Sequence, residues 1–456
     1  MMRKRIFKKV LFMILCSAIL LGSASCAPKR TASKSTGTST RSSTESSYSS
    51  SGSSSAGGQT GSAPVTLNLW HIWGSGDSNS DAVSKVISDY EARNPNVKIK
   101  VQTFENDAYK TTIRTSVSDG TAPDVFSTWG GGFSKAFVDS GKVLKLDDSL
   151  NDGTLSRVIG GALTNFTYDG SVYGLTFGMS CSGFFCNTAL FDKYNLELPE
   201  TWDELLSDIE VFKENGVIPI STTFKERWVI GMLFEAIALK AVGAEQLYPT
   251  LTKTGGTFSD PQYLNAANRL MELVDAGAFN EDASAISRDE AEVSVKNGEA
   301  AMYYMGSWAS GTVEADDSVD KGKFKFIPFP TLPDGNGKAT EFNGGGADGL
   351  MISSTTKNPK EAVAFLKYLA ENLAREDYQE GNYLPLWKDV KVDESKINPV
   401  TLDIVGVTSN ATDFILWWDT LMEGEDITTY QDALDSLILK QITPEQFVEE
   451  LKTIQP

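Results

Sequence analysis

The sequence is poor in the residues that most hydrolytic and metal-dependent sites use. Of its 456 residues, only His71 is a histidine. Catalytic triads, proton shuttles and most zinc sites depend on histidine, so its scarcity argues against all three. The chain also lacks a GxxxxGK[ST] loop and a strand-linked GxGxxG motif, which argues against the nucleotide sites built on them. We therefore predict neither a cofactor nor a metal.

One short motif points weakly toward calcium. Asp77, Asn79 and Asp81 have the alternate spacing with which an EF-hand loop begins. Ala82 stands where that loop needs its turn glycine, however, and Ser88 stands where it needs a bidentate glutamate. We interpret Asp81 instead as the capping residue of a helix.

Cysteine is nearly as rare as histidine. Cys16 and Cys26 lie near the N-terminus, and Cys181 and Cys186 lie five residues apart in the middle of the chain. Within a strand, an odd spacing directs two side chains to opposite faces, and a chain of this length does not need disulfides for stability. We predict that Cys181 and Cys186 are two buried, unpaired thiols.

Long apolar runs are confined to the start of the chain. Residues 10–21 are apolar and follow five basic residues at positions 3, 4, 5, 8 and 9. A membrane-spanning helix needs roughly 20 apolar residues, so this pattern predicts a secretory signal over residues 1–25. The small residues 23–25 directly before Cys26 resemble a bacterial lipobox, although Ser23 stands where leucine is usual. We expect a lipid anchor on Cys26, with ordinary cleavage after Ser25 as the alternative.

Residues 26–64 contain little except serine, threonine and glycine after the cysteine. Such a segment cannot bury enough apolar surface to offset the entropy of ordering. Chains rich in serine and glycine behave as flexible coils. We predict a flexible tether between the lipid anchor and the folded part.

Positive charge is also in short supply. The chain carries 41 basic and 60 acidic residues, a net charge of −19, and without the basic residues of the leader the balance is −24. A surface of this sign repels nucleic acid and anionic lipid headgroups. The sequence therefore argues against a nucleic-acid partner and favours an uncharged ligand.

The pattern from residue 65 onward predicts a two-lobed α/β protein. Strands are expected at residues 65–73, 96–104 and 122–129, with amphipathic helices between them, which is the signature of a parallel sheet with crossover helices. Later helices carry clear end signals. They include a capping box that starts at Thr201, glycine at Gly277 and proline at Pro359. We predict that each lobe is a mostly parallel sheet flanked by helices, with ligand bound in a cleft between lobes.

Tryptophan is abundant. Several of the nine tryptophans follow a predicted strand or stand beside glycine, which suits a flat apolar surface that a ligand can approach. Pyranose rings pack their C–H faces on such surfaces, and carboxylates and amides bind their hydroxyl groups. Trp202 is an exception, because its place in the capping box predicts a core residue. The nine are Trp70, Trp73, Trp129, Trp202, Trp228, Trp308, Trp387, Trp417 and Trp418.

Carboxylate pairs keep one enzymatic alternative open. A glycosidase needs two carboxyl groups about 5–9.5 Å apart, and sequence alone does not give that distance. Asp203–Glu204 and Glu449–Glu450 are better interpreted as helix surface. An exported glycoside hydrolase or transglycosylase lipoprotein thus remains the alternative function, followed by a sugar sensor that signals to a kinase and by binders of peptide, phosphate or metal.

Several stretches together resemble a known family. They are VSKVISDYEARNPNVKIKV, APDVFSTWGGG, LFDKYNLELPETWDEL, VKNGEAAMYYMGSW and FNGGGADGLMISSTTKNPKEAVAFLKYL. Their combination, which extends from about residue 65 to the C-terminus, resembles the family 1 extracellular solute-binding proteins of ABC importers. The resemblance implies two lobes joined by crossing strands, with residues 65–177 and 307–344 in lobe 1 and residues 178–306 and 345–456 in lobe 2.

The resemblance also implies a set of ligand-binding residues. By position they are Trp73, Glu105, Trp129, Trp228, Trp308, Asp348, Trp417, Trp418 and Asp419, with only one of the adjacent Trp417 and Trp418 needed at the ligand. No charged residue directly follows Trp129, where maltose binders carry an acid and a base. A different neutral oligosaccharide, such as a xylo-oligosaccharide, therefore fits as well as maltodextrin.

The expected function is that of a non-enzymatic substrate-binding component of an ABC importer. It would capture a neutral oligosaccharide between its lobes and deliver it to a membrane permease. The same reasoning predicts a monomer that is anchored by lipid at the extracellular face of the cell membrane.

Overall fold

The computed structural model describes residues 64–159 and 161–454. The predicted signal, the Cys26 anchor and nearly all of the predicted tether lie outside these residues. Within the described part of the chain, no helix combines the length and the apolar character that a membrane span requires.

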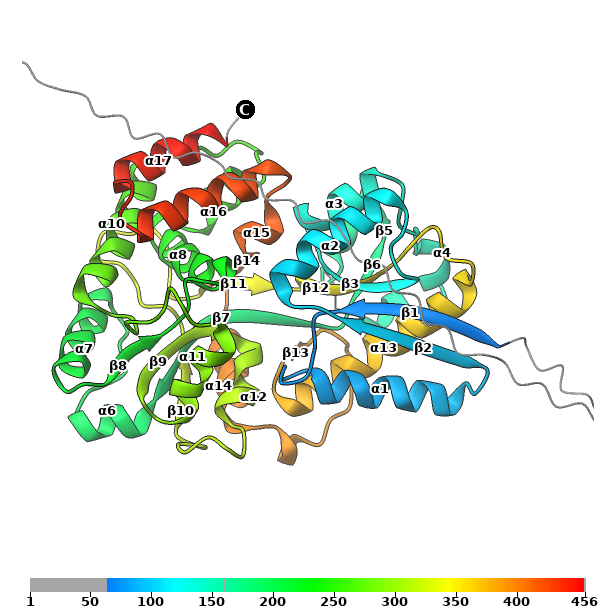
Figure 1. Ribbon diagram of the computed structural model, residues 1–456, viewed down its shortest axis with the longest axis horizontal. Helices are drawn as coiled ribbons and strands as arrows, with labels where there is room; N and C mark the ends of the chain where they lie inside the picture. Colours follow the sequence, from blue (N-terminus) through cyan, green and yellow to red (C-terminus); the bar gives the residue numbers. More distant parts are fainter. Residues whose placement is uncertain (1–63, 160, 455–456) are drawn as a thin grey trace, which may run out of the picture. The chain divides into compact units, whose positions relative to one another are not determined.

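The first lobe is built on a five-stranded sheet with the order β2-β1-β3-β12-β6 (Figure 1). Its strands are β1 (Val65–His71), β2 (Val97–Thr103), β3 (Val125–Trp129), β6 (Gly174–Thr176) and β12 (Asp348–Ile352). Strands β1, β2 and β3 are parallel, whereas β12 runs antiparallel to both β3 and β6. The three parallel strands are those that the sequence predicts.

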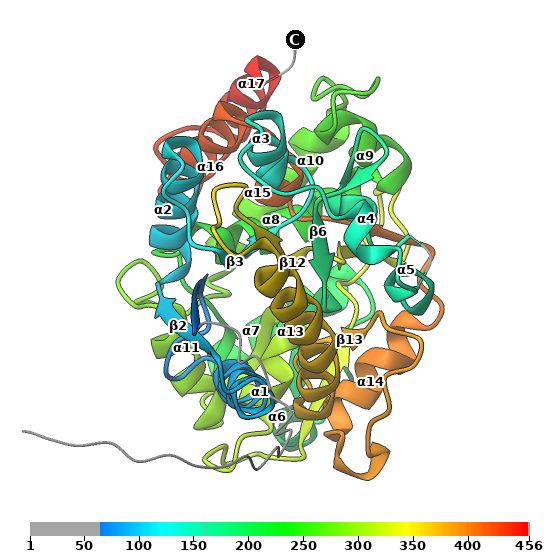
Figure 2. The ribbon, with the colours of Figure 1, turned by 90° about the vertical axis from the view of Figure 1, so that its right-hand side faces the viewer.

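Helices cover both faces of this sheet. On one face, α1 (Ser80–Arg93) packs against α13 (Pro359–Glu380), and Tyr90 and Phe365 are in ring contact between them. On the other face, α2 (Asn106–Asp119) and α3 (Gly132–Asp139) enclose Tyr109, Phe126 and Phe133. Figure 2 shows α1 and α13 lying along the lower part of the lobe. Smaller elements complete it: α4 (Asp147–Leu150), α5 (Thr154–Arg157), β4 (Thr167–Tyr168) and β5 (Ser171–Val172).

The second lobe is built around the ten-residue strand β7 (Gly178–Asn187). The sheet has the order β14-β11-β7-β9-β8, and β10 and β13 pair with other parts of β7. Its other strands are β8 (Ile218–Ser221), β9 (Ala300–Gly306), β10 (Phe324–Ile327), β11 (Glu341–Gly345), β13 (Leu384–Pro385) and β14 (Asp413–Ile415). Because β7 is antiparallel to all four strands it pairs with, this sheet is mixed rather than mostly parallel.

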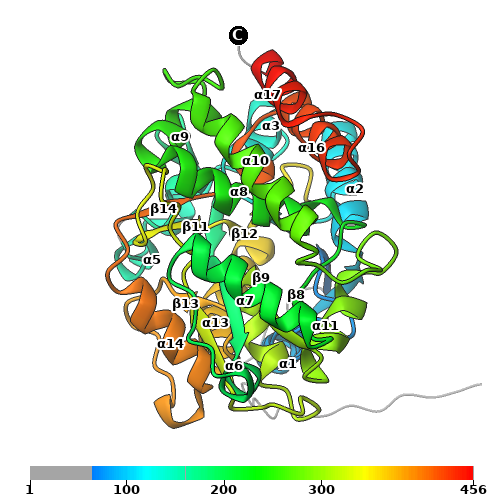
Figure 3. The same cartoon turned by 90° about the vertical axis from the view of Figure 1, so that its left-hand side faces the viewer.

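One helix forms the centre of the second lobe. In α8 (Arg227–Val242), every residue from position 229 to 242 is buried. Against it pack α10 (Pro261–Ala276), α16 (Glu425–Ile438) and α17 (Pro444–Thr453), and α7 (Trp202–Glu214) packs on α10 and β8 (Figure 3). The remaining helices are α6 (Thr188–Tyr194), α9 (Ala244–Leu251), α11 (Arg288–Lys296), α12 (Ser310–Val313), α14 (Pro399–Thr408) and α15 (Trp418–Leu421).

The helix-end signals of the sequence are confirmed. Thr201 forms a capping box with Glu204 at the start of α7, and Gly277 ends α10 in the left-handed conformation with a φ of 71°. At α1, by contrast, the N-cap is Asn79, and the expected capping residue Asp81 lies within the first turn. Cys181 and Cys186 are buried and unpaired, as predicted.

The strand pairing corrects the expected lobe boundaries. Residues 307–344 were assigned to lobe 1, but β10 and β11 in this segment pair with β7 of the second sheet. Residues 345–456 were assigned to lobe 2, but β12 completes the first sheet and α13 packs in the first core. The physical reason is that β12 pairs with β3 and β6, whose residues lie more than 150 positions earlier, and local sequence patterns do not encode such a pairing.

Candidate functional site

A cavity of about 450 Å³ is lined by residues of both lobes. The first lobe contributes the loop after β1, the start of α2 and the end of β3. The second lobe contributes the starts of α8, α11 and α15. All the ligand-binding residues that the family resemblance implies line this cavity except Trp418: Trp73, Glu105, Trp129, Trp228, Trp308, Asp348, Trp417 and Asp419.

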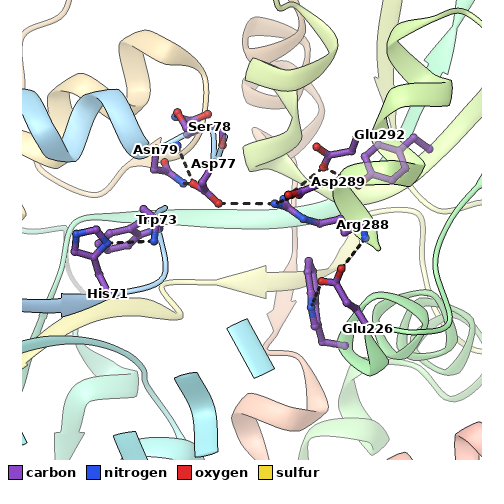
Figure 4. Close-up of polar contacts among 12 residues, drawn as sticks. His71, Trp73, Asp77, Ser78, Asn79, Glu226, Arg288, Asp289 and Glu292 are labelled. Carbon is purple, nitrogen blue, oxygen red and sulfur yellow. Dashed lines mark hydrogen bonds and ion pairs between the residues drawn. The ribbon is translucent and has the colours of Figure 1, made fainter. Parts of the chain in front are cut away.

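The loop after β1 is held by His71. The Trp73 backbone N–H donates to His71 Nδ1 at 3.2 Å (Figure 4). Burial lowers the pKa of His71 to about 4, so the ring is neutral at pH 7 and its Nδ1 can accept this bond. Trp73 itself is 4% exposed and packs edge-on against Phe177. It therefore closes one end of the cavity mainly as a buried wall.

Glu105 and Trp129 have fixed positions at strand ends. Glu105 is the N-cap of α2, and its carboxylate accepts hydrogen bonds from the backbone N–H groups of Asp107 and Ala108 at 3.1 and 3.0 Å. Trp129 is the last residue of β3, and its half-buried ring packs edge-on against Phe133, with 5.1 Å between the ring centroids. Both side chains are thus oriented within the first lobe.

Three tryptophans of the second lobe form a row in which Trp308 contacts the other two. The ring centroids of Trp308 lie 6.4 Å from those of Trp228 and 5.5 Å from those of Trp417. The indole N–H of Trp417 donates to Ser182 Oγ at 2.9 Å, and that of Trp228 donates to Glu226 at 3.2 Å. We call Trp228, Trp308 and Trp417 the aromatic platform. Because the two outer indoles are hydrogen-bonded and Trp308 packs against both, the orientations of all three are set by the protein.

Trp418 lies elsewhere, which corrects its assignment to the site. Its ring is fully buried among Phe234, Phe258 and Tyr430 in the core of the second lobe. Trp417 is the extended N-cap of α15, whereas Trp418 is the first residue of that helix. This change of backbone conformation sends the two adjacent rings in different directions.

Asp348 is the first residue of β12, close to the point at which the chain passes from the second sheet to the first. Burial raises the pKa of its carboxyl group to about 7, although the hydrogen bond with Tyr383 opposes the shift. Tyr383 also lines the cavity. The floor of the cavity therefore carries a carboxyl group that gains its proton near neutral pH.

Two ion pairs join the lobes on either side of the cavity. Lys110 Nζ on α2 lies 2.6 Å from a carboxylate oxygen of Asp419, in the first turn of α15. Asp77, in the loop after β1, lies 3.9 Å from the Arg288 guanidinium at the start of α11 (Figure 4). We call these the cross-lobe ion pairs. Lys110 and Arg288 had no motif to identify them, because each is a single cation at an ordinary helix position.

The lobes also touch without charges. At Gly132, the first residue of α3, a Cβ atom would lie 2.4 Å from the carbonyl oxygens of both Leu421 and Met422. Real side chains do not come this close to backbone, so only glycine permits the contact. The run of glycines after Trp129 thus lets the end of α15 lie directly on the first lobe.

The charges at the cavity are mostly negative. Six acidic side chains line it, at Asp77, Glu105, Glu226, Asp289, Asp348 and Asp419, against the two cations Lys110 and Arg288, so negative charge is in excess even when Asp348 is protonated. No group of acidic, histidine or cysteine side chains in the described residues is arranged to hold a metal ion. Flat aromatic surfaces together with hydrogen-bond acceptors suit a ligand that has many hydroxyl groups and no negative charge.

The comparisons with known proteins agree with this architecture. Residues 75–375 match the family model of the bacterial extracellular solute-binding proteins. An uncharacterised ABC transporter extracellular-binding protein of Pyrococcus horikoshii is 29% identical over 86% of this chain and 87% of its own.

Two solved structures are also similar. One, described with xylan utilization by the thermophilic bacterium Caldanaerobius polysaccharolyticus, is 37% identical, with a TM-score of 0.82 over 85% of this chain and 99% of its own. The other, a chitin oligosaccharide binding protein, is 26% identical, with a TM-score of 0.78 over 86% of this chain and 98% of its own. From the family model and the shared two-lobed fold, we conclude that the chain belongs to the bacterial extracellular solute-binding proteins, the family that includes the sugar-binding components of ABC transporters.

Proposed function

We propose that this protein binds an uncharged oligosaccharide in the cavity between its lobes and delivers it, unmodified, to the permease of an ABC importer. The observation that carries the proposal is the aromatic platform of the second lobe together with Trp129 of the first, all lining one cavity. Membership of the solute-binding family supports a binding rather than a catalytic role.

The platform explains how a sugar could be held without a charge. A pyranose ring presents C–H groups on its faces, and these gain contact area on an indole that is already oriented. The hydroxyl groups around the ring edge can donate to Glu105, Glu226 and Asp289 at the cavity wall. A ligand without those donors would displace water from these carboxylates without replacing its hydrogen bonds, which is costly, and the arrangement therefore favours polyhydroxylated ligands.

The carboxylate excess bears on the class of sugar. Both cations of the cavity are already paired with acidic side chains. A uronic acid or a phosphorylated sugar would therefore meet uncompensated negative charge. Among neutral oligosaccharides we propose xylo-oligosaccharides first, because the 37%-identical structure is described with xylan utilization.

The remaining parts of the proposal concern location and movement. The two lobes close on the ligand because the ligand binds the closed arrangement better than the open one. A lipid on Cys26 and the tether that follows it keep the monomeric protein near the permease at the extracellular face. The negative net charge disfavours nucleic acid as a partner, which is consistent with this arrangement.

Calorimetry against a panel of tetrasaccharides tests the proposed class. We expect xylotetraose to bind and to be recovered intact, as shown by chromatography after incubation. Chitotetraose and maltotetraose serve as neutral competitors, and a xylo-oligosaccharide with a glucuronic acid branch should bind more weakly than its unbranched form. Release of shorter products would favour the glycosidase alternative, and no binding across the panel would refute the proposal.

The variant Trp129→Ala tests the site itself. We expect its affinity to fall more than tenfold while its thermal unfolding temperature stays close to that of the native protein, because Trp129 ends a strand at the cavity wall. Trp202→Phe is the matched control. Trp202 is buried in the core of the second lobe, so this change should lower stability and leave affinity unaltered. Equal affinity of Trp129→Ala and the native protein would contradict the assignment.

A further inference from the structure

We propose that the cross-lobe ion pairs are positioning elements that favour the closed arrangement of the lobes, so that the affinity for an uncharged sugar depends on ionic strength. The inference rests on the proposed function only for its affinity measurement. Its structural basis is the placement of four charged side chains at the walls of the cavity.

The stronger pair lies between α2 and α15. The distance from Lys110 Nζ to Asp419 is 2.6 Å, and the two side chains are only 17% and 12% exposed. Lys110 Nζ also lies 5.2 Å from the centroid of the Trp129 ring. Lys110 therefore links a carboxylate of the second lobe to the proposed sugar-binding ring of the first. Charges that are this poorly solvated interact more strongly than fully exposed pairs.

The second pair depends on two prearranged partners. Asp77 accepts hydrogen bonds from the backbone and side-chain nitrogens of Asn79 at 2.9 and 3.2 Å, which fixes its carboxylate at the loop after β1. Opposite it, the backbone N–H of Arg288 donates to Glu226 at 2.6 Å, and Glu226 also accepts from the indole N–H of Trp228. The second pair is thus connected to the aromatic platform through Glu226, whose bond with Arg288 is drawn in Figure 4.

The polarity of the two pairs is opposite. The first lobe supplies the cation to the pair with Asp419, and the second lobe supplies the cation to the pair with Asp77. Each cation also has an acidic neighbour in its own lobe. Lys110 lies 4.0 Å from Asp107, and Arg288 lies 2.8 Å from Asp289. Opening therefore leaves no cation unpaired, and we expect the pairs to change affinity severalfold rather than by many orders of magnitude.

A double-mutant cycle on the stronger pair is the decisive experiment. Lys110→Met and Asp419→Asn keep the approximate shape of each side chain and remove its charge. Measured by calorimetry with xylotetraose in 20 mM NaCl, we expect each single variant to bind about tenfold more weakly, and the double variant to be no weaker than the worse single one. If the two losses multiply instead, both residues act on the sugar independently and the proposal is wrong.

The dependence of sugar affinity on ionic strength is a second measurement. A purely structural role of the ion pairs would leave it unchanged. We expect xylotetraose affinity of the native protein to fall about twofold between 20 and 500 mM NaCl, because salt stabilises the separated charges of the open arrangement. The affinity of Lys110→Met should change less, since only the pair of Asp77 with Arg288 remains. The charge-exchanged variant Lys110→Glu/Asp419→Lys should recover part of the lost affinity. Lys296→Met is the matched control, because Lys296 and Asp317 form a 2.7 Å pair within the second lobe, and its salt response should equal that of the native protein.

A measurement without sugar separates this inference from the proposed function. Spin labels carried by p-acetylphenylalanine at Thr115 of α2 and Thr428 of α16, both exposed, would report the distance between the lobes. We expect Lys110→Met and high salt each to lengthen that distance in the ligand-free protein. If no sugar binds but the distance responds, the proposed function fails and the ion pairs stand. If sugar binds and neither distance nor affinity responds, the ion pairs have no such role.

Discussion

The two walls of the cavity are built in different ways. The second lobe presents a row of three indoles in which the central Trp308 contacts the other two, and those two are fixed by hydrogen bonds to Ser182 and Glu226. The first lobe presents two separate indoles, the buried Trp73 and the half-buried Trp129, whose ring packs against Phe133 and lies near Lys110. One wall is therefore a continuous, prearranged aromatic surface, and the other combines separate rings with charged groups.

This difference separates two contributions to binding. A rigid surface gives contact area without the entropic cost of ordering side chains. Charged groups at the other wall meet the opposite lobe only when the lobes are together, so they contribute to closure. If the walls differ in this way, a change in the aromatic platform should weaken sugar binding most, a change at the contact between the lobes should weaken it less, and removal of a single buried carboxyl group should have the smallest effect.

Trp308→Ala should have the largest effect. Trp308 is the central member of the aromatic platform and lies so close to Gly306 that a Cβ there would be 2.2 Å from the indole ring. Its removal takes away its own contact area and the lateral support of both neighbours, and we expect affinity for xylotetraose to fall about 100-fold. Calorimetry measures the loss, with near-ultraviolet circular dichroism to verify folding. A smaller loss than for Trp129→Ala would show that the platform is not the dominant wall.

Gly132→Ala should have an intermediate effect. The added methyl group would collide with the carbonyl oxygens of Leu421 and Met422, so the end of α15 must move away from the first lobe. We expect about tenfold weaker sugar binding from this overpacking. Gly406→Ala in α14 is the control, because no atom lies within 4 Å of its Cβ position and alanine favours helix. Unchanged affinity of Gly132→Ala would mean that this contact does not limit closure.

Asp348→Asn should have the smallest effect, seen in the pH dependence of stability. Burial raises the pKa of Asp348 to about 7 in the folded protein, above its value in the unfolded chain. The folded state therefore holds a proton that the unfolded state has lost. The stability from this group is present below pH 4 and disappears as pH rises through 7.

Thermal unfolding between pH 4 and 8 measures this contribution. Relative to the native protein, Asp348→Asn should lose less stability as pH rises to 7. Asp208→Asn is the matched variant in the second lobe, since burial raises the pKa of that carboxyl group to about 7 as well. It should flatten the stability profile similarly while leaving sugar affinity unchanged. Parallel profiles for native protein and Asp348→Asn would show that the carboxyl group ionises normally.

Local features of the fold could be predicted from the sequence because they depend on neighbouring residues. The three parallel strands of the first lobe, the capping box at Thr201 and the end of α10 at Gly277 each have a signal within a few positions. The assignment of β11 and β12 to different sheets has no such signal. It depends on which distant strand each one meets, and only Gly346 and Ala347 separate the two strands.

The same distinction applies to the site. Tryptophans beside glycine or at strand ends can be recognised as candidate ligand-binding residues from the sequence. All the proposed ones except Trp418 line the cavity. Trp418 was misplaced because sequence does not show that α15 begins between two adjacent tryptophans. The sequence gives no signal for Lys110 and Arg288, and Asp77 stands out only in a weak calcium-like motif, because charged residues are common on surfaces and only the arrangement of the lobes brings these three together.

The position of β12 in the first sheet has a further consequence, for the kinetics of folding. This strand lies between β3 and β6 in the sheet. Its residues 348–352 are synthesised long after those of its two neighbours. The first sheet is therefore incomplete until about three quarters of the chain exists, and pairings this far apart in sequence form slowly. A polypeptide that must cross a membrane before it folds would gain time from this order of synthesis.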